Sequence, residues 1–277
     1  MKSKPLTLAA WIFGLAIPAH AALVAHYKFD EAAGASTAAN ELAGATGAVG
    51  SAVTTGVAGI SGNAYSFGGA TATQNDIVDM GNASFFSAIT TSGQMTISAW
   101  INTSDTTGNR NTAVFAGDST SNSVYADLGV AAGQAGFEGS ASARVRPAGA
   151  NSAQQTGIYS SPAVAPVNDG NWHHLVMTVN LSTADLSLYV DGVLANSQTM
   201  ATPLFPVFNN FEIGRLGRSS PVDPFQGLVD DVQVYDQALS ASEVQFLFDN
   251  PGTAVPEPSA MAIAGLGIIS LLRRRRG

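Results

Sequence analysis

The chain has 277 residues, enough for one large all-β domain or two modest domains. Charged residues make up only 12% of it and hydrophobic residues 45%, and there is no cysteine. The lack of cysteine excludes disulfides, thiol catalysis, iron–sulfur clusters and cysteine-ligated zinc. Six of the 12 basic residues lie in two terminal clusters, so the body between them carries six basic residues against 20 acidic ones. Such an acidic body argues against nucleic-acid binding, which needs clusters of Lys and Arg for phosphate contacts.

Residues 1–21 are typical of a secretory signal peptide. Lys2 and Lys4 precede a short apolar run, and Ala19 and Ala21 give the small-x-small pattern that signal peptidase cleaves. We expect cleavage after Ala21, which makes Ala22 the new N-terminus. The alternative, a first core strand or helix, is disfavoured because lysine-flanked apolar starts followed by such a pattern seldom serve a fold.

Between the two ends, short segments of alternating hydrophobicity predict β-strands. In the first of them every second residue from Met95 to Ile101 shares one apolar face. Asp191-Gly192 separates two apolar runs and predicts a tight hairpin, since Gly tolerates the positive φ of a type I′ turn. The segments with this pattern are 95–101, 172–180, 186–190, 211–214 and 228–235. With no long helical periodicity and no second domain, the pattern predicts two packed antiparallel sheets.

One short helix is expected after the last strand. Ser240 and Glu243 have the spacing of a capping box, in which each side chain satisfies a free backbone N–H group of the other residue. Val244, Leu247 and Phe248 would then face the sheets. Residues 251–254 would link the helix to the C-terminal tail.

The tail has three parts in a fixed order. Val255-Pro256-Glu257-Pro258 comes first, then the uncharged run 259–272, then Arg273-Arg274-Arg275-Arg276. As a helix, the roughly 14 apolar residues would span about 21 Å, which is short of a ~30 Å hydrocarbon core. The arginines should stay on the cytoplasmic side, as should the N-terminal lysines, so the body lies outside the inner membrane.

This order of motifs resembles the PEP-CTERM sorting signal of Gram-negative bacteria, over the last two dozen residues. The resemblance implies two processing partners, signal peptidase at the N-terminus and an exosortase, a membrane cysteine protease-transpeptidase that acts at the Pro-Glu-Pro motif. It also implies transient anchoring in the inner membrane before the protein reaches the cell surface or the extracellular matrix.

The body, residues 22–250, resembles the laminin-G-like, concanavalin A-like jelly-roll family. Single pieces are short, but six of them occur in order. They are LVAHYKFD (23–30), GNAYSF (62–67), MTISAW (95–100), WHHL (172–175), LYVDG (188–192) and FQGLVDDVQVYDQAL (225–239). The resemblance implies an all-β antiparallel sandwich of about a dozen strands. Residues 104–165 depart from it most, and not every strand can be placed there.

No set of catalytic residues emerges from the sequence. Some relatives on this fold hydrolyse β-glucans with a Glu-x-Asp-x-x-Glu run, which is missing here. Asp230 and Asp231 are adjacent, so a regular strand would send them to opposite faces. His173 and His174 have no G-x-S-x-G motif to accompany them and are expected to be structural. We therefore expect a non-catalytic protein; a glucanase-type glycoside hydrolase and a purely structural matrix protein are the alternatives.

A structural calcium ion is the cofactor that the family resemblance implies. On the matching positions, Asp30 and Asp230 would donate carboxylates, and Gly62 and Asn63 could add carbonyl oxygens. Strand alternation would put Asp230 on the same face as the core residues Leu228, Val232 and Val234, where a carboxylate needs an ion or hydrogen-bond donors. Both possibilities remain open: a calcium ion, or backbone and hydroxyl donors.

Sugar binding would require exposed aromatic side chains. Trp100 and Trp172 lie in strand patterns and are expected in the core. Tyr125, Phe137 and Tyr159, in the loop-rich region, are the better candidates for stacking on sugars. The sequence thus favours an exported binding or adhesion module associated with a glycan, such as an extracellular polysaccharide, or with matrix; the ligand-binding residues remain unknown.

Overall fold

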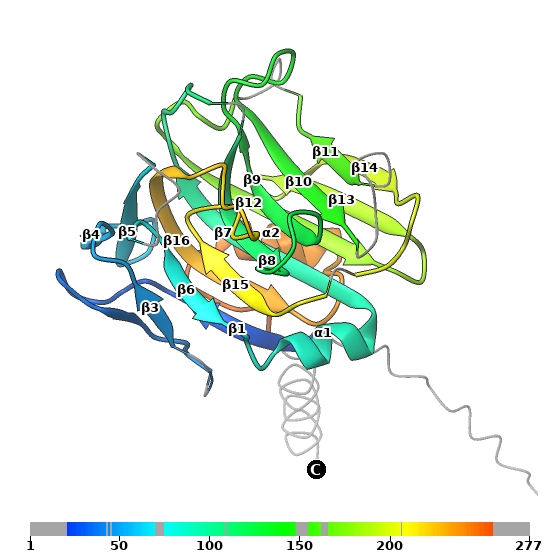
Figure 1. Cartoon of the computed structure of the whole chain (residues 1–277), viewed down its shortest axis with the longest axis horizontal. Helices are drawn as coiled ribbons and strands as arrows, with labels where there is room; N and C mark the ends of the chain where they lie inside the picture. Colours follow the sequence, from blue (N-terminus) through cyan, green and yellow to red (C-terminus); the bar gives the residue numbers. More distant parts are fainter. Residues whose placement is uncertain are drawn as a thin grey trace, which may run out of the picture.

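Two eight-stranded sheets, antiparallel throughout, stack face to face (Figure 1). The computed structural model describes residues 21–256, except 43, 45, 70–74, 109, 148–154, 162–165 and 206. Sheet A has the order β14-β13-β12-β7-β16-β5-β4, with β1 beside β16, and sheet B has the order β11-β10-β9-β8-β15-β6-β3-β2. The expected all-β antiparallel sandwich is confirmed.

The strands of sheet A are β1 (Leu23–Tyr27), β4 (Thr54–Ala58), β5 (Asn63–Gly68), β7 (Gln94–Asn102), β12 (Trp172–Asn180), β13 (Asp185–Val190), β14 (Val193–Thr199) and β16 (Gln226–Tyr235). Those of sheet B are β2 (Thr37–Ala38), β3 (Gly47–Val49), β6 (Val78–Gly81), β8 (Asn111–Gly117), β9 (Tyr125–Ala131), β10 (Ser140–Arg146), β11 (Thr156–Tyr159) and β15 (Asn210–Ile213). The helices are α1 (Phe86–Ser92) and α2 (Ala241–Asp249). Within the described residues, no helix is long and apolar enough to span a membrane.

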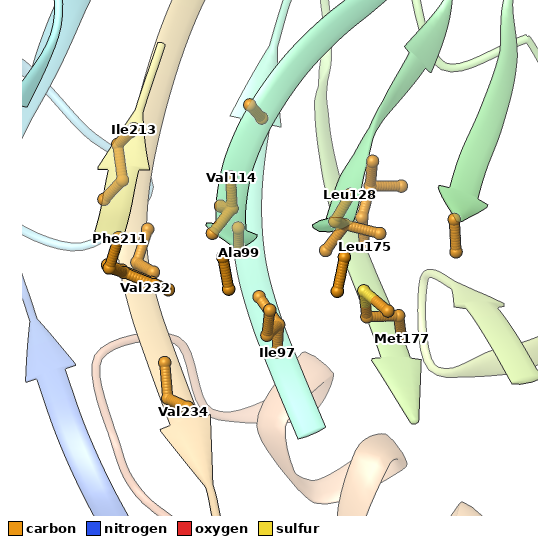
Figure 2. Packing of buried hydrophobic residues seen from close by; sticks show 14 of the residues in the cluster. Ile97, Ala99, Val114, Leu128, Leu175, Met177, Phe211, Ile213, Val232 and Val234 are labelled. Carbon is orange, nitrogen blue, oxygen red and sulfur yellow. The ribbon is translucent and has the colours of Figure 1, made fainter. Parts of the chain in front are cut away.

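The core lies between the sheets and is built from the faces that alternation predicts. Ile97 and Ala99 of β7 and Leu175 and Met177 of β12 meet Val114, Leu128, Phe211 and Ile213 of sheet B (Figure 2). The expected hairpin at Asp191-Gly192 is present, with φ of 51° and 79° at its two central residues. Four strands, β8 to β11, occupy the region 104–165 that the sequence left unplaced.

A second cluster lies on the outward face of sheet A, beneath α2. Val176 and Tyr235 pack there against Val244 and Leu247 of the helix. Trp100 also belongs to this face: its ring lies 5.0 Å from that of His174 and 5.6 Å from that of Phe248. Trp100 is buried as expected, under the helix instead of between the sheets.

The strand registers define two ends of the sandwich. At the terminal pole β1 begins opposite the end of β16, which pairs with the start of β7, and β13 begins opposite the end of β14. At the distal pole β7 ends opposite the start of β12. The terminal pole comprises residues 82–93, 118–124, 181–184, 200–205, 207–209 and 236–240. The distal pole comprises residues 103–108, 132–139, 166–171 and 191–192. All of these residues lie in loops or turns apart from α1.

The N-terminal cap of α2 should contribute to the stability of the helix that covers the outward cluster. The Ser240 hydroxyl accepts the N–H of Glu243, and the Glu243 carboxylate accepts the N–H of Ser240, which confirms the capping box. Replacing Ser240 with Ala should lower the free energy of unfolding by about 1 kcal/mol, measured by urea denaturation.

The matched control is Ser240→Asn, which keeps an acceptor oxygen at the cap and should retain most of the stability. Equal losses in the two variants would mean that the hydroxyl–amide bond does not stabilise the helix.

Candidate functional site

The rim residues expected to bind calcium do come together, at the turn between β4 and β5. Asp30 Oδ1 accepts the N–H of Asn63 at 2.8 Å, and Asn63 Nδ2 donates to the Asp30 carbonyl at 3.0 Å. Asp230 Oδ2 accepts the N–H groups of Ile60 (2.9 Å) and Ser61 (3.1 Å). The two carboxylates thus hold one turn, residues 59–63, from opposite sides.

The turn also needs glycine. Gly62 has φ +70°, a conformation that side chains rarely adopt, and a Cβ there would overlap the Asp30 carboxylate. A Cβ on Gly59 would likewise overlap the carboxylate of Asp230. The close approach of both carboxylates therefore depends on two positions without side chains.

A bulge in β16 changes the face that Asp230 occupies. The pairing with β7 shifts between Asp230 and Gln233, and Asp231 has φ +48°. Val229 packs in the inter-sheet core, whereas Leu228 is half-buried outside it. The expectation that Leu228 and Asp230 share a face with Val232 and Val234 is wrong, because the extra residue switches the alternation.

Both aspartates face outward as a result. Asp230 lies opposite Trp100 and Gln233 lies opposite Ser98, and directly opposed residues project to the same side. Asp231 contacts His26 and Gln233 on that side. The prediction that the two carboxylates lie on opposite faces of the strand is therefore wrong as well.

The donor set can now be compared with the needs of calcium, which takes six to eight oxygen ligands. One oxygen of each carboxylate already accepts backbone N–H groups, and the carbonyl of Gly62 accepts the N–H of Gly59. Within the described parts of the chain no cluster of three or more His, Asp or Glu could hold a metal ion. The residues as placed fit a hydrogen-bonded turn better than a calcium cage, and calcium at Asp30, Gly62, Asn63 and Asp230 stays a prediction.

One atom at this rim is left without a partner. Asp230 Oδ1 is buried and makes no hydrogen bond to the described residues. Burial raises the pKa of this carboxyl to about 7, so a proton can neutralise it near neutral pH.

A hydrogen-bond network on the same face reaches the tail. His26 Nε2 lies 2.6 Å from Asp231 Oδ1, which also accepts Gln233 Nε2 at 2.9 Å. Gln233 Oε1 accepts the Tyr235 hydroxyl, which in turn accepts the N–H of Val255 at 3.1 Å. The N–H of Gly252 donates to Asp231 Oδ2 at 2.7 Å.

This network fixes the chain up to the start of the Pro-Glu-Pro motif. Val255 and Pro256 are described; Glu257, Pro258 and Arg273 to Arg276 lie outside the described residues. The N-terminal end lies beside it: the N–H of Ala22 donates to Asp236 Oδ1 at 2.9 Å, and Ala21 is buried in the outward cluster. Residues 1–20 of the expected signal peptide, Ala19 among them, lie outside the described residues.

At the other end of the molecule an aromatic pair reaches the surface. Phe137, 38% exposed, stacks on Tyr159 with ring centroids 4.4 Å apart. Arg110 Nη2 donates to the Tyr159 hydroxyl at 2.6 Å, and that hydroxyl lies 3.3 Å from Gln134 Oε1. Phe137, Tyr159 and Arg110 together form a feature that we call the aromatic platform.

Tyr125, the third predicted aromatic, is not part of the surface. Its exposure is 3%, and its ring packs with Phe115 and Leu216 under the 215–222 segment. Arg110, by contrast, gave no signal in the sequence, because a lone Arg in a loop has no pattern. Its Nε is buried and makes no hydrogen bond to the described residues.

Two buried acidic groups on the outward face of sheet B are neutralised by arginines. Arg144, 2% exposed, contacts both carboxylate oxygens of Asp127, with Nη2–Oδ2 at 2.6 Å. Arg215 Nε lies 2.6 Å from Glu212 Oε2. These carboxylates are held in buried ion pairs and are not exposed to a ligand.

The two adjacent histidines have structural partners. His173 lies between Asp191 and Asp169, whose hydrogen bonds raise its pKa. His174 is buried against Trp100, its Nε2 lies 2.8 Å from Ser98 Oγ, and burial lowers its pKa to about 4.

A pH experiment tests the buried carboxyl of Asp230. Its folded-state pKa is above the unfolded value, so its contribution to stability is complete below about pH 4 and is lost as the pH rises through about 7. Asp230→Asn removes this titration. Relative to that variant, the wild type should lose about 2–3 kcal/mol of unfolding free energy between pH 5 and pH 8, at about 1.4 kcal/mol per pH unit below the folded pKa.

All other ionisable groups are the same in the two proteins, so the difference between them reports on Asp230. Asp185→Asn, at an exposed strand position, is the control and should show no such change. A wild-type-to-variant difference that is the same at both pH values would contradict the assignment.

A second experiment tests calcium at the rim. Because the turn amides already engage both carboxylates, the melting temperature should be the same in EDTA and in millimolar calcium. A ligand that binds only the native state must stabilise it by mass action. A rise in melting temperature that Asp230→Asn abolishes would instead support the ion.

Comparisons with known proteins match this architecture. Residues 72–245 match the family described as the concanavalin A-like lectin/glucanases superfamily, and residues 254–276 match the PEP-CTERM protein-sorting motif. No curated protein matches the chain.

Several solved structures share the fold at low identity. The binding domain of Paraclostridial mosquitocidal protein 1 is similar with a TM-score of 0.60 and 17% identity, over 82% of this chain and 51% of that one. Domain 4 of AbnA, a GH43 extracellular arabinanase from Geobacillus stearothermophilus solved with arabinotriose, has a TM-score of 0.53 and 20% identity, over 82% and 98%. The binding domain of botulinum neurotoxin DC, in complex with rat synaptotagmin II, has a TM-score of 0.59 and 13% identity, over 82% and 51%.

The chain thus spans about half the length of the two toxin domains and nearly all of the arabinanase domain. The family match covers more than half of the 277 residues and coincides with two packed antiparallel sheets. This chain belongs to the concanavalin A-like lectin/glucanases superfamily and carries a PEP-CTERM protein-sorting motif at its C-terminal end.

Proposed function

We propose that this protein is an exported, non-catalytic glycan-binding module. Signal peptidase would release its N-terminus, and the C-terminal tail would hold it at the inner membrane until an exosortase-type enzyme sorts it to the cell surface or extracellular matrix. The observation that carries the binding role is the aromatic platform at the distal pole.

The platform has the chemistry that a sugar needs. Phe137 offers an exposed ring face, on which the C–H groups of a pyranose or furanose can stack. Arg110 lies beside it and is half-buried, and its terminal guanidinium nitrogens have more N–H groups than the one that donates to Tyr159, so the others can serve sugar hydroxyls. Tyr159 joins the other two residues of the platform, because its hydroxyl accepts a hydrogen bond from Arg110 and its ring stacks on Phe137.

The placement of the acidic residues argues for binding without catalysis. Hydrolysis of a glycosidic bond requires two carboxyl groups that flank the bond and can exchange protons with it. On the outward face of sheet B, Asp127 and Glu212 are instead buried against Arg144 and Arg215. The similar domains named above are binding domains of toxins and an arabinanase domain solved with arabinotriose, which supports a binding role and suggests a first probe.

A glycan array with the purified protein tests the proposal, with arabinotriose among the probes. Phe137→Ala should weaken binding to the retained glycan about tenfold, which corresponds to about 1.4 kcal/mol for a lost stacking face. Arg110→Gln should weaken it to a similar extent, because it removes charged donors. Affinities are measured by titration calorimetry.

Leu204→Ala is the matched control, since it truncates another exposed apolar side chain, 56% exposed, in the segment between β14 and β15 at the opposite pole from the platform. It should leave the affinity unchanged. If no glycan is retained, the structural-matrix alternative is favoured, and sugar release from β-glucans would instead establish a hydrolase.

A further inference from the structure

Exposed apolar side chains occur at a few places on this molecule. Those of Leu204 and Val207 are 56% and 55% exposed, and both belong to the segment 200–209 between β14 and β15. Val193 and Leu194, on β14, and Phe137, on the aromatic platform, are the other large apolar residues classed as exposed in the described chain. Leu204 and Val207 have no role in binding at the distal pole, because they lie at the terminal pole.

The segment 200–209 is held in place by its own aromatic residues. Phe208 stacks on Phe86 of α1 with ring centroids 4.9 Å apart and lies 5.5 Å from Phe205. Met200 is buried, and the N–H of Asn209 donates to the Gly117 carbonyl at 2.9 Å. Along the chain, these contacts lie on both sides of Leu204 and Val207, whose own side chains are exposed.

The surface around these two side chains has little charge. No Asp, Glu, Lys or Arg occurs in residues 82–93, 181–184, 200–209 or 237–240, which form most of the terminal pole. Asp118 also lies at this pole, where it accepts the side-chain N–H of Asn209, and Asp185, Asp236 and Glu243 border it. Asp236 already accepts the N–H of Ala22. A surface of this composition can leave water without stripping charges of their hydration.

Both chain ends leave the body at this pole. Leu23 lies opposite Tyr235, and the Tyr235 hydroxyl accepts the N–H of Val255, so the two ends meet at one residue. The uncharged run 259–272 and its four arginines follow Val255 within a few residues. A tail held in a bilayer therefore brings the terminal pole close to the lipid surface.

From these observations we propose that the terminal pole rests on the lipid bilayer while the protein is anchored, with Leu204 and Val207 inserted at the level of the headgroups. This rests on the membrane anchoring in the proposed function. Exposed apolar side chains that can be buried at the boundary between headgroups and acyl chains are what an interfacial contact needs. The aromatic platform, at the distal pole, then faces away from the membrane and is accessible to polymers.

The absence of cysteine makes a clean test possible. Single-cysteine variants Leu204→Cys and Val207→Cys of the full chain are labelled with an environment-sensitive fluorophore. They are then reconstituted into phosphatidylcholine vesicles, whose zwitterionic surface does not repel an acidic body. Val193→Cys is the matched control: the same residue type as Val207, 66% exposed, at the opposite end of the sheet.

We expect quenching by a doxyl-labelled lipid to be several-fold stronger at positions 204 and 207 than at 193. Equal quenching at 207 and 193, in protein that floats with the vesicles, overturns the contact. Protein that does not float overturns the anchoring on which it rests.

A fluorophore at 207 that is already shielded without vesicles, in a sample that sediments as a dimer, would assign this surface to a second copy of the chain and overturn the proposal. Phe137→Ala tests the glycan role alone and should leave the lipid quenching unchanged, so the two proposals fail separately.

Discussion

From Val229 to Tyr235 both faces of β16 are closed to water, and the rest of the structure depends on how this strand satisfies its polar groups. Its inward face meets sheet B, and its outward face is covered by α2 and the segment that follows it. Buried polar groups need partners inside the protein, and two adjacent carboxylates need many of them. The bulge at Asp231 meets this need, because it turns both carboxylates outward while Val229 and Val232 remain in the core.

The partners recruited by these carboxylates determine the position of other segments. Asp230 holds the turn between β4 and β5, and Asp231 holds His26 of β1 and the N–H of Gly252. The rim, the first strand and the exit of the tail are thus fixed by consecutive residues of one strand. Sheet B satisfies its outward polar groups differently, with the buried Asp127–Arg144 and Glu212–Arg215 pairs. These charges are neutralised inside the protein and are not available to a ligand.

Much of the fold could be predicted from local sequence patterns, such as strands in which buried and exposed residues alternate. The alternation in β7 and β12, the turn at Asp191-Gly192 and the capping box at Ser240 each depend on local pattern, and each is confirmed. Strands β8 and β9 were missed because every residue in them is buried, so alternation between buried and exposed positions is lost. β10 was missed because its sequence is polar. Its Arg144 can be buried only because Asp127, 17 residues earlier on the neighbouring strand, accepts its hydrogen bonds. Helix α1 has only seven residues and no side-chain cap to indicate its start.

The candidate site was predicted in part for similar reasons. Phe137 could be found because an aromatic residue in a variable loop is unusual, whereas Tyr125 was assigned to the surface although the 215–222 segment covers it. The meeting of Asp30 and Asp230 at one turn was expected from family resemblance. Their backbone partners could not be, since amide groups leave no trace in a sequence. The face that Asp230 occupies depended on a single bulged residue that periodicity does not reveal.

The hydrogen bond from Val255 to Tyr235 has a geometric consequence for the tail. The Pro-Glu-Pro sequence begins one residue after a backbone amide that is bonded to a side chain of the sheet. An enzyme that acts on this motif would therefore have to accommodate the whole sandwich beside its active site. In the anchored state proposed above, the described chain is tied to β16 as far as Val255, so the sandwich is held close to the point where the tail begins.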